Sequence, residues 1–146
     1  MRLITILFIL TCNVSFAQWN NNFETAKQKA GIEHKNILLN FSGSDWCGPC
    51  IRMHKEIFDD TIFKSFADTS LVLVNADFPR MKKNQLDKTV QAQNNKLADQ
   101  YNSKGIFPYT LLLSAEGKVL KAWEGLPKET PQEFTSEINS TTHVGK

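Results

Sequence analysis

The sequence predicts an α/β protein with a central mixed β-sheet flanked by helices. Three observations support this class. Short apolar segments with strand character alternate with segments of helical periodicity along a chain of 146 residues. The last two apolar segments are separated only by AEGK, which is typical of the turn of a β-hairpin. Strands separated by helices favour parallel pairing, so the sheet is expected to combine a parallel portion with a hairpin.

The first half of the chain predicts a helix, a buried strand and a further helix. Phe23, Ala26 and Ala30 recur at spacings of three and four, which indicates a helix in NNFETAKQKAGIEHK. The apolar run NILLNFSG then predicts a buried strand. In CIRMHKEIF, one helical stripe holds Cys50, Met53, His54, Ile57 and Phe58. The following DDTIFKSFAD either extends this helix or restarts it at an aspartate cap.

The second half predicts three further strands and two helices. SLVLVNAD reads as a buried strand, and a polar stretch after it contains an expected helix from Leu86 to Tyr101. YTLLLS and VLKAWEG are the two strands of the hairpin, and the second alternates apolar with polar residues. PQEFTSEIN begins like a helix, because Pro131 in a first turn lacks only an N–H that would be unpaired there.

Composition excludes several classes of protein. The chain is 41% hydrophobic and 22% charged, as in ordinary globular domains, and its length allows one domain. Its formal net charge is +2, with acidic and basic residues interleaved, so no patch indicates a nucleic-acid partner. No apolar segment after the N-terminus is long enough to cross a bilayer. We expect a monomer with no stable membrane insertion.

The N-terminus resembles a secretory signal peptide. MRLITILFILTCNVSFAQ has a basic residue, an apolar run too short for the ~20 residues of a membrane span, and small residues before a cut after Ala17. This predicts a signal peptide at 1–17, a single domain at 18–146, and a periplasmic or secreted protein. Two alternatives remain open. One is a buried N-terminal strand, and the other is a lipoprotein signal ending at Cys12, which lacks the usual preceding small residue.

Cleavage after Ala17 would leave two cysteines, Cys47 and Cys50. A disulfide between them closes a tiny loop and stabilises the fold little, which favours redox chemistry or metal binding. Zinc requires four ligands, or three and a water, and the chain offers three histidines and no second CxxC. Covalent haem requires CxxCH, but residue 51 is isoleucine. A structural disulfide and a zinc site stay as alternatives, and we expect no metal or other cofactor beyond the Cys47–Cys50 disulfide.

The cysteine pair falls where the first predicted strand meets a helix. Pro49 suits the first helical turn, so Cys47 is expected at the helix N-terminus and Cys50 one turn further. Their Cα atoms would lie roughly 5–5.5 Å apart, inside the disulfide range. The helix dipole favours thiolate, and such cysteines have pKa values of about 3.5–7.5. Cys47, at the exposed end, is predicted to be the nucleophile, and the covered Cys50 the resolving thiol. Neither Gly48 nor Pro49 adds charge to the thiolate.

DWCGPC after an apolar strand, with GIFPYTLLLSAEGKV some sixty residues later, resembles the thioredoxin fold from about Phe23 to Ile138. W-C-x-x-C followed by MHKEIF is similar to the thioredoxin-like group that includes the C-terminal domain of the transmembrane reductant carrier DsbD. The resemblance implies an exported thiol-disulfide oxidoreductase with disulfide-containing client proteins and a membrane thiol carrier as partners. Reduction of clients is the favoured direction. An oxidase, an isomerase and a non-catalytic client-binding module remain open.

The resemblance also implies roles for three residues near the cysteines. Pro108 would be the family's cis-proline facing the pair. Phe107 would offer its backbone to an extended client strand, a form of β-augmentation. Trp46 would flank the active site, or would serve packing alone.

Three departures from thioredoxin stand out. The buried aspartate of thioredoxin falls at Asn40, and its lysine partner falls near Leu73. The acidic residue that the DsbD-like group often has seven positions after the first cysteine is here His54. His54 either relays protons, since histidine titrates near neutral pH, or is a partly exposed helix residue. The polar segment Arg80 to Gln100 is longer than in thioredoxin, and it either shapes partner choice or is a solvated loop and helix.

Overall fold

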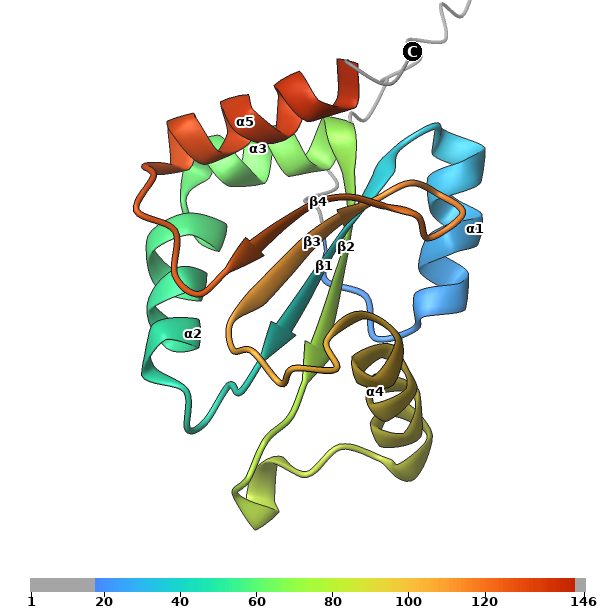
Figure 1. The fold of residues 1–146 in the computed structure, drawn as a ribbon, viewed down its shortest axis with the longest axis vertical. Helices are drawn as coiled ribbons and strands as arrows, with labels where there is room; N and C mark the ends of the chain where they lie inside the picture. Colours follow the sequence, from blue (N-terminus) through green and yellow to red (C-terminus); the bar gives the residue numbers. More distant parts are fainter. Residues whose placement is uncertain (1–17, 144–146) are drawn as a thin grey trace, which may run out of the picture.

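The computed structural model describes residues 18–143, so the expectations for a signal peptide at 1–17 and for Cys12 lie outside the described residues. A four-stranded sheet forms the centre of the molecule (Figure 1). Its strands are β1 (Asn36–Ser42), β2 (Leu71–Asp77), β3 (Tyr109–Leu113) and β4 (Val119–Glu124). The order is β2-β1-β3-β4, with β1 parallel to β2 and the other pairs antiparallel. The predicted mixed sheet is confirmed.

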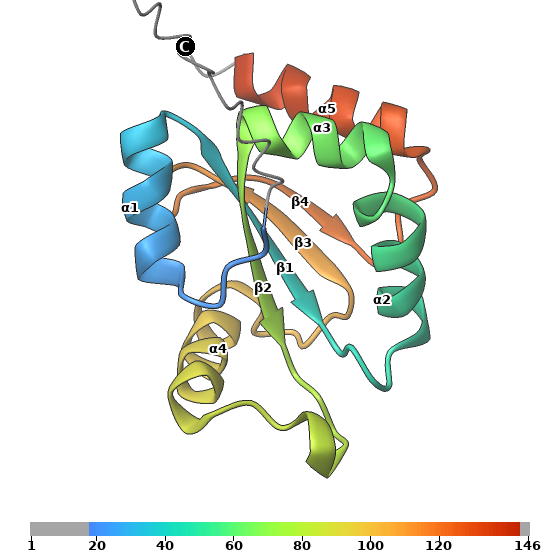
Figure 2. The same cartoon turned by 180° about the vertical axis from the view of Figure 1, so that it is seen from behind.

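Helices cover both faces of this sheet, as the two opposite views show (Figures 1 and 2). The helices are α1 (Phe23–Glu33), α2 (Gly48–Met53), α3 (Thr61–Ser70), α4 (Lys88–Tyr101) and α5 (Pro131–His143). Two short segments add to them: the π-helical η1 (His54–Phe58) and the 3₁₀ turn η2 (Lys82–Asn84). Helices α1 and α4 lie on one face, and α2, α3 and α5 lie on the other.

Alternate residues of β1 supply the two apolar cores. Ile37, Leu39 and Phe41 belong to a cluster with α1 and α4, whereas Leu38 belongs to a cluster with α2, η1, α3 and α5. Because a strand points successive side chains to opposite faces, a strand covered on both sides must be apolar throughout. Asn40 is the exception within this run, and it lies at the end of the strand that leads to the cysteines.

Aspartate caps set two helix starts that the periodicity alone left uncertain. The helix expected from Leu86 begins at Lys88, because the carboxylate of Asp87 accepts the N–H groups of Thr89 and Val90. Asp60 restarts the chain as α3 by accepting the N–H of Ile62. Side chains at helix starts commonly satisfy such free N–H groups. The second of the two alternatives for DDTIFKSFAD is therefore the observed one.

The outer strand β4 is held through its polar residues. Lys121 and Trp123 face α5 and both donate hydrogen bonds to Glu137, the Trp123 Nε1 at 2.8 Å. These hydrogen bonds lower the pKa of Glu137. Val119 and Leu120 are exposed, and only Lys121 and Trp123 of this strand are partly buried.

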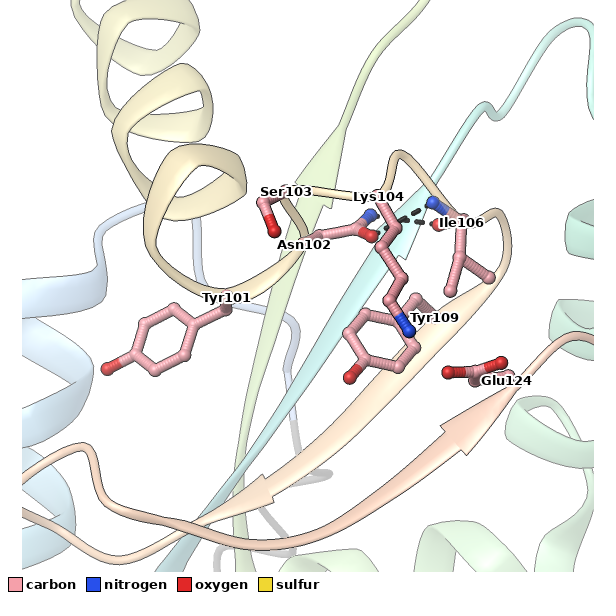
Figure 3. A pocket seen from close by; sticks show the side chains of 7 residues that line it. All are labelled: Tyr101, Asn102, Ser103, Lys104, Ile106, Tyr109 and Glu124. Carbon is pink, nitrogen blue, oxygen red and sulfur yellow. Dashed lines mark hydrogen bonds between the residues drawn. The ribbon is translucent and has the colours of Figure 1, made fainter.

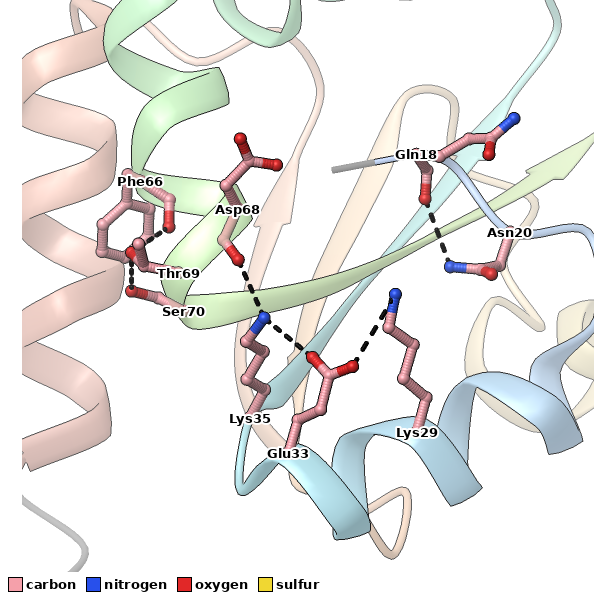
Figure 4. A network of polar contacts seen from close by, with 9 residues as sticks. All are labelled: Gln18, Asn20, Lys29, Glu33, Lys35, Phe66, Asp68, Thr69 and Ser70. Atoms are coloured by element: carbon pink, nitrogen blue, oxygen red, sulfur yellow. Dashed lines mark hydrogen bonds and ion pairs between the residues drawn. The ribbon is translucent and has the colours of Figure 1, made fainter. Parts of the chain in front are cut away.

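A polar network fastens the end of the sheet that lies away from the cysteines (Figure 4). Lys35 Nζ donates to the backbone oxygen of Asp68 at 2.8 Å and pairs with Glu33 at 2.8 Å. The hydrogen bond from Lys35 lowers the pKa of Glu33. Lys35 thereby joins the C-terminal end of α1 to the end of α3. We infer that these contacts stabilise the fold.

Candidate active site around Cys47 and Cys50

The cysteine pair lies at the junction of β1 and α2, as predicted. Cys47 is the N-cap of α2, and Pro49 lies in the first turn. The Cys47 Sγ accepts the N–H of Cys50 at 3.3 Å, so the sulfur itself caps the helix. A helix N-terminus provides unpaired N–H groups and a partial positive charge, both of which favour a thiolate at this atom.

The two sulfurs form a disulfide with an Sγ–Sγ distance of 2.03 Å and a Cα–Cα distance of 5.2 Å. The predicted Cα separation is confirmed. The prediction that Cys47 forms an exposed end is wrong for this oxidised state, since Cys47 is 5% exposed and Cys50 is 3% exposed. Gly48 and Pro49 are the exposed residues of the motif.

Trp46 is fixed by contacts on several sides. Its Nε1 donates to the backbone oxygen of Phe78 at 2.7 Å, and its ring meets Phe107 edge to face at 5.4 Å. The Arg80 guanidinium lies 3.7 Å from the ring centroid. Gly43 lies against the ring, where a Cβ would come within 2.3 Å of it. The indole therefore joins the cysteine loop to two segments that are distant in sequence.

The loop before β3 contains the expected cis peptide bond between Phe107 and Pro108. Pro108 is buried, and its backbone oxygen accepts the N–H of Gly125. The Trp46–Phe107 contact places this loop beside the cysteine motif.

Asn102, which sequence reasoning missed, clamps the same loop (Figure 3). Its side chain donates to the backbone oxygen of Ile106 at 2.8 Å and accepts the Ile106 N–H at 2.9 Å. Asn102 is 4% exposed and Ile106 is half-buried, so both bonds are partly shielded from water. An amide can satisfy a donor and an acceptor of one residue at once, which fixes the backbone directly before Phe107.

A buried group of neutral polar side chains replaces the acid of thioredoxin. Asn40 is 5% exposed and donates through Nδ2 to Asn75 Oδ1 at 3.1 Å. Thr110 donates to Asn40 Oδ1 at 3.0 Å. The partner of Asn40 on β2 is thus Asn75, whereas Leu73, near which the lysine position of thioredoxin was expected, pairs with Leu38 and lies in the apolar core. Asn75 and Thr110 were not singled out from the sequence.

His54 shares a surface pocket of about 350 Å³ with Cys50 and Asn75. Its side chain is 54% exposed, and Nδ1 lies 3.2 Å from Asp59 Oδ2. Burial raises the pKa of Asp59, but hydrogen bonds from Lys64 and His54 outweigh it and leave the pKa below its ordinary value. The structure brings His54 and Cys50 to one pocket, and it also shows His54 as a partly exposed helix residue.

Asp45 ties the start of the polar segment to the cysteine loop. Its carboxylate accepts the N–H groups of Arg80 and Met81 and the Nδ2 of Asn84, each at 2.9 Å. The bond from the Arg80 N–H is the main reason that the pKa of Asp45 is lowered. The beginning of the polar segment is therefore anchored beside the motif, although its side chains are solvated.

Within residues 18–143, no three His, Cys, Asp or Glu side chains are placed to hold a metal ion together. In the same part of the chain, no helix is both long and apolar enough to span a bilayer.

The fold and a CxxC disulfide at a helix N-terminus define a thioredoxin-like thiol-disulfide oxidoreductase. A family model described as a thioredoxin-like domain matches residues 23–141, and the chain belongs to this family. The expected thioredoxin fold is thereby confirmed.

The chain is also similar to individual proteins of known name or structure. The chain is 38% identical over 112 residues to the disulfide bond reductase DsbH of Chlamydia pneumoniae, covering 77% of this chain but 63% of that protein. A solved DsbH oxidoreductase has a TM-score of 0.79 and 30% identity, covering 98% of this chain and 96% of the other. The oxidised C-terminal domain of DsbD from Neisseria meningitidis shares the fold alone, with a TM-score of 0.54 and 16% identity, covering 82% and 89%. The chain thus spans less than two thirds of the C. pneumoniae relative.

Proposed function

We propose that this protein is an exported reductase of disulfides in client proteins and that Cys47 and Cys50 carry the exchange. One observation carries the proposal: the disulfide closes over the N-terminus of α2, with the Cys47 sulfur accepting the N–H of Cys50. The similarity to a protein named disulfide bond reductase supports the reducing direction.

The exchange transfers two electrons from the dithiol to the client. The Cys47 thiolate attacks one sulfur of the client disulfide, forming a mixed disulfide and releasing the second client sulfur as a thiolate that takes a proton. Cys50 then loses its proton and attacks the Cys47 sulfur, which releases the first client sulfur as a thiol. The end state is the Cys47–Cys50 disulfide, which is the form that the structure shows. The N–H of Cys50 and the helix N-terminus stabilise the attacking thiolate.

The residues between the cysteines favour a reductant. A dithiol is a strong oxidant when its reduced form is unusually stabilised, as in DsbA at about −120 mV, whereas thioredoxin lies at about −270 mV. Gly48 and Pro49 carry no charge or side-chain donor, so the thiolate gains only the helix terminus. We therefore expect a reduction potential below roughly −220 mV.

The client would bind in the loop that the structure fixes beside the motif. Phe107, next to the buried Pro108, would offer its backbone to an extended client strand, and Trp46 would border it. Asn102 holds this loop through Ile106 and so supports the binding geometry.

Export is part of the proposal. The apolar start of the chain is proposed as a signal peptide cleaved near Ala17, which would place a monomeric domain in the periplasm or outside the cell. An exported reductase needs electrons from across the membrane, so a membrane thiol carrier is the proposed electron donor. No metal or organic cofactor is needed for thiol-disulfide exchange.

Two measurements test the function. Equilibration with glutathione buffers, followed by alkylation and mass analysis, gives the reduction potential, for which a value near −150 mV would favour an oxidase or isomerase. Reduction of insulin by dithiothreitol tests catalysis, which a purely client-binding module would not accelerate. A potential below −220 mV together with accelerated insulin reduction is the expected result.

A further inference from the structure

The segment Phe78–Asn84, with the sequence FPRMKKN, leaves the end of β2 and passes the cysteine loop. We call it the basic segment, because Arg80, Lys82 and Lys83 are exposed within it. Met81 is 48% exposed among these cations. Figures 1 and 2 show that it projects from the same end of the sheet as the connection between β1 and α2.

The basic segment is exposed but anchored. The two residues that precede Cys47 hold it: Asp45 accepts two backbone N–H groups and one side-chain amide from it, and Trp46 donates to the Phe78 oxygen. The Arg80 guanidinium also lies over the Trp46 ring, a contact favourable to a cation. Because all these contacts involve the cysteine loop, the backbone that carries the positive charges keeps a fixed place relative to Cys47.

The cations of the basic segment remain available to a partner. Within residues 18–143, Arg80, Lys82 and Lys83 form no ion pair with a carboxylate within 4.0 Å. The nearby carboxylate of Asp45 is occupied by N–H donors, and that of Asp77 is occupied by Ser44. A charged, anchored surface with an exposed thioether fits an acidic polypeptide that also carries apolar side chains.

We propose that the basic segment is a docking surface for client proteins whose disulfide is flanked by acidic residues. This rests on the proposed function, since it adds a client preference to the same site. Charges carried by an anchored backbone near the site steer an oppositely charged partner and raise its association rate, and added salt weakens the effect. The preference therefore concerns kcat/KM, because it acts on encounter and not on the sulfur chemistry.

A pair of peptides tests this client preference. Both carry the same intramolecular disulfide, and three residues beside it are glutamate in one peptide and glutamine in the other. We expect kcat/KM for the glutamate peptide to exceed that for the glutamine peptide by about tenfold at low salt, with a ratio that falls towards one in high salt. Equal values for the two peptides at low salt would overturn the proposal, whereas reduction of neither peptide would refute the proposed function itself.

Charge variants locate the preference. The Lys82→Glu/Lys83→Glu variant should bring the ratio to one or below, and Lys82→Gln/Lys83→Gln should give an intermediate ratio. Lys96→Glu/Lys118→Glu makes the same change of net charge at exposed lysines outside the basic segment and should keep the parent ratio. An equal loss in the control variant would overturn the proposal in favour of a general charge effect. Binding to anionic lipid vesicles without discrimination between the peptides would also overturn it and indicate a membrane surface as the partner.

Discussion

Asn40 and Asn75 meet amide to amide between neighbouring parallel strands, with the Asn40 Nδ2 donating to the Asn75 Oδ1 at 3.1 Å. Thr110 completes the arrangement by donating to the oxygen of Asn40. Asn75 lines the same pocket as Cys50, so this neutral group lies next to the space around the thiol that we propose as the resolving one. Amides and hydroxyls do not titrate near neutral pH, and the pair therefore offers no acid for the exchange.

Restoring an acid at Asn40 should make stability depend on pH. In Asn40→Asp, burial would raise the pKa of the introduced carboxyl above its unfolded value of about 3.9. The free energy of unfolding of Asn40→Asp, relative to the parent, is then highest below about pH 4 and falls as the pH rises through the pKa of the carboxyl in the folded state. The loss amounts to about 1.4 kcal/mol for each pH unit by which the folded pKa exceeds the unfolded one. Urea unfolding at pH 4 and pH 8 measures it. Asn95→Asp, at an exposed position of α4, is the control, and the same pH dependence in both variants would contradict the prediction.

The place of His54 in the Cys50 pocket leads to a kinetic prediction. If His54 relays protons, His54→Ala should slow the resolving step several-fold and flatten the pH profile between about 6 and 8. Stopped-flow decay of the mixed disulfide measures that step directly. His34→Asn is a matched control, because His34 is exposed and lies at the C-terminal end of α1. The backbone of His34 is left-handed, a conformation that asparagine tolerates. Equal rates for parent and His54→Ala across this range would leave His54 as a surface residue.

The two cysteines should fail in different ways when replaced. Cys47→Ser should abolish reduction, because the attacking thiolate is lost, whereas Cys50→Ser should accumulate mixed disulfides with clients. In the reduced protein, alkylation at mildly acidic pH should label Cys47 faster, since its sulfur caps α2. Mass analysis of the labelled peptides reads both results. Faster labelling of Cys50 would invert the assignment.

The Asn102 clamp predicts an effect on client binding that leaves the redox pair intact. Asn102→Ala removes both bonds to Ile106 and leaves buried backbone groups unpaired, which should destabilise the fold by about 1–3 kcal/mol. KM for a disulfide peptide should rise several-fold, while the reduction potential stays at the parent value. Asn95→Ala, at an exposed position of the preceding helix, controls for the loss of an amide. A changed potential with an unchanged KM would contradict the positioning role.

Anchoring by Asp45 can be measured through access to the basic segment. Asp45→Asn lacks a carboxylate to receive all three donors, so trypsin should cleave after Lys82 or Lys83 several-fold faster than in the parent. Asp99→Asn, at an exposed site on α4, should match the parent. Because the folded pKa of Asp45 is lowered, the anchoring is complete above its unfolded pKa of about 3.9 and is lost as pH falls through the folded value. Hydrogen exchange at Arg80 and Met81 should therefore show loss of protection only in acid.

Local features of the sequence were sufficient to predict the fold and the cysteine pair. Apolar periodicity located the strands, and Pro49 with the CxxC spacing located Cys47 at a helix start. Position 40 was correctly placed on a buried strand, and the position of its thioredoxin partner was expected near Leu73, two residues before Asn75, which is the residue that pairs with Asn40. The register of parallel strands is set by packing over a long crossover, and no hairpin turn fixes it locally.

The parts of the candidate site that were missed depend on contacts between segments distant in sequence. Nothing near Asp45 indicates that its carboxylate binds N–H groups more than thirty residues later. The burial of Cys47 was mispredicted because spacing fixes the position of a Cα atom and not the direction of its sulfur. Asn102 does lie four residues before Ile106, and an asparagine at the end of a predicted helix is a signal for local backbone bonding.

Among residues 18–143, neither of the two apolar clusters that flank the sheet includes a cysteine. We therefore expect that opening the disulfide leaves the contacts of these two clusters in place, so that both redox forms unfold from the same clusters. A thermodynamic cycle then links folding to electron affinity: a folded oxidised form that is more stable than the reduced form makes the protein a stronger reductant than its unfolded chain. About 1.4 kcal/mol of that difference corresponds to about 30 mV. Two unfolding curves, one for each redox form, would thus measure how far the fold shifts the potential without any redox buffer.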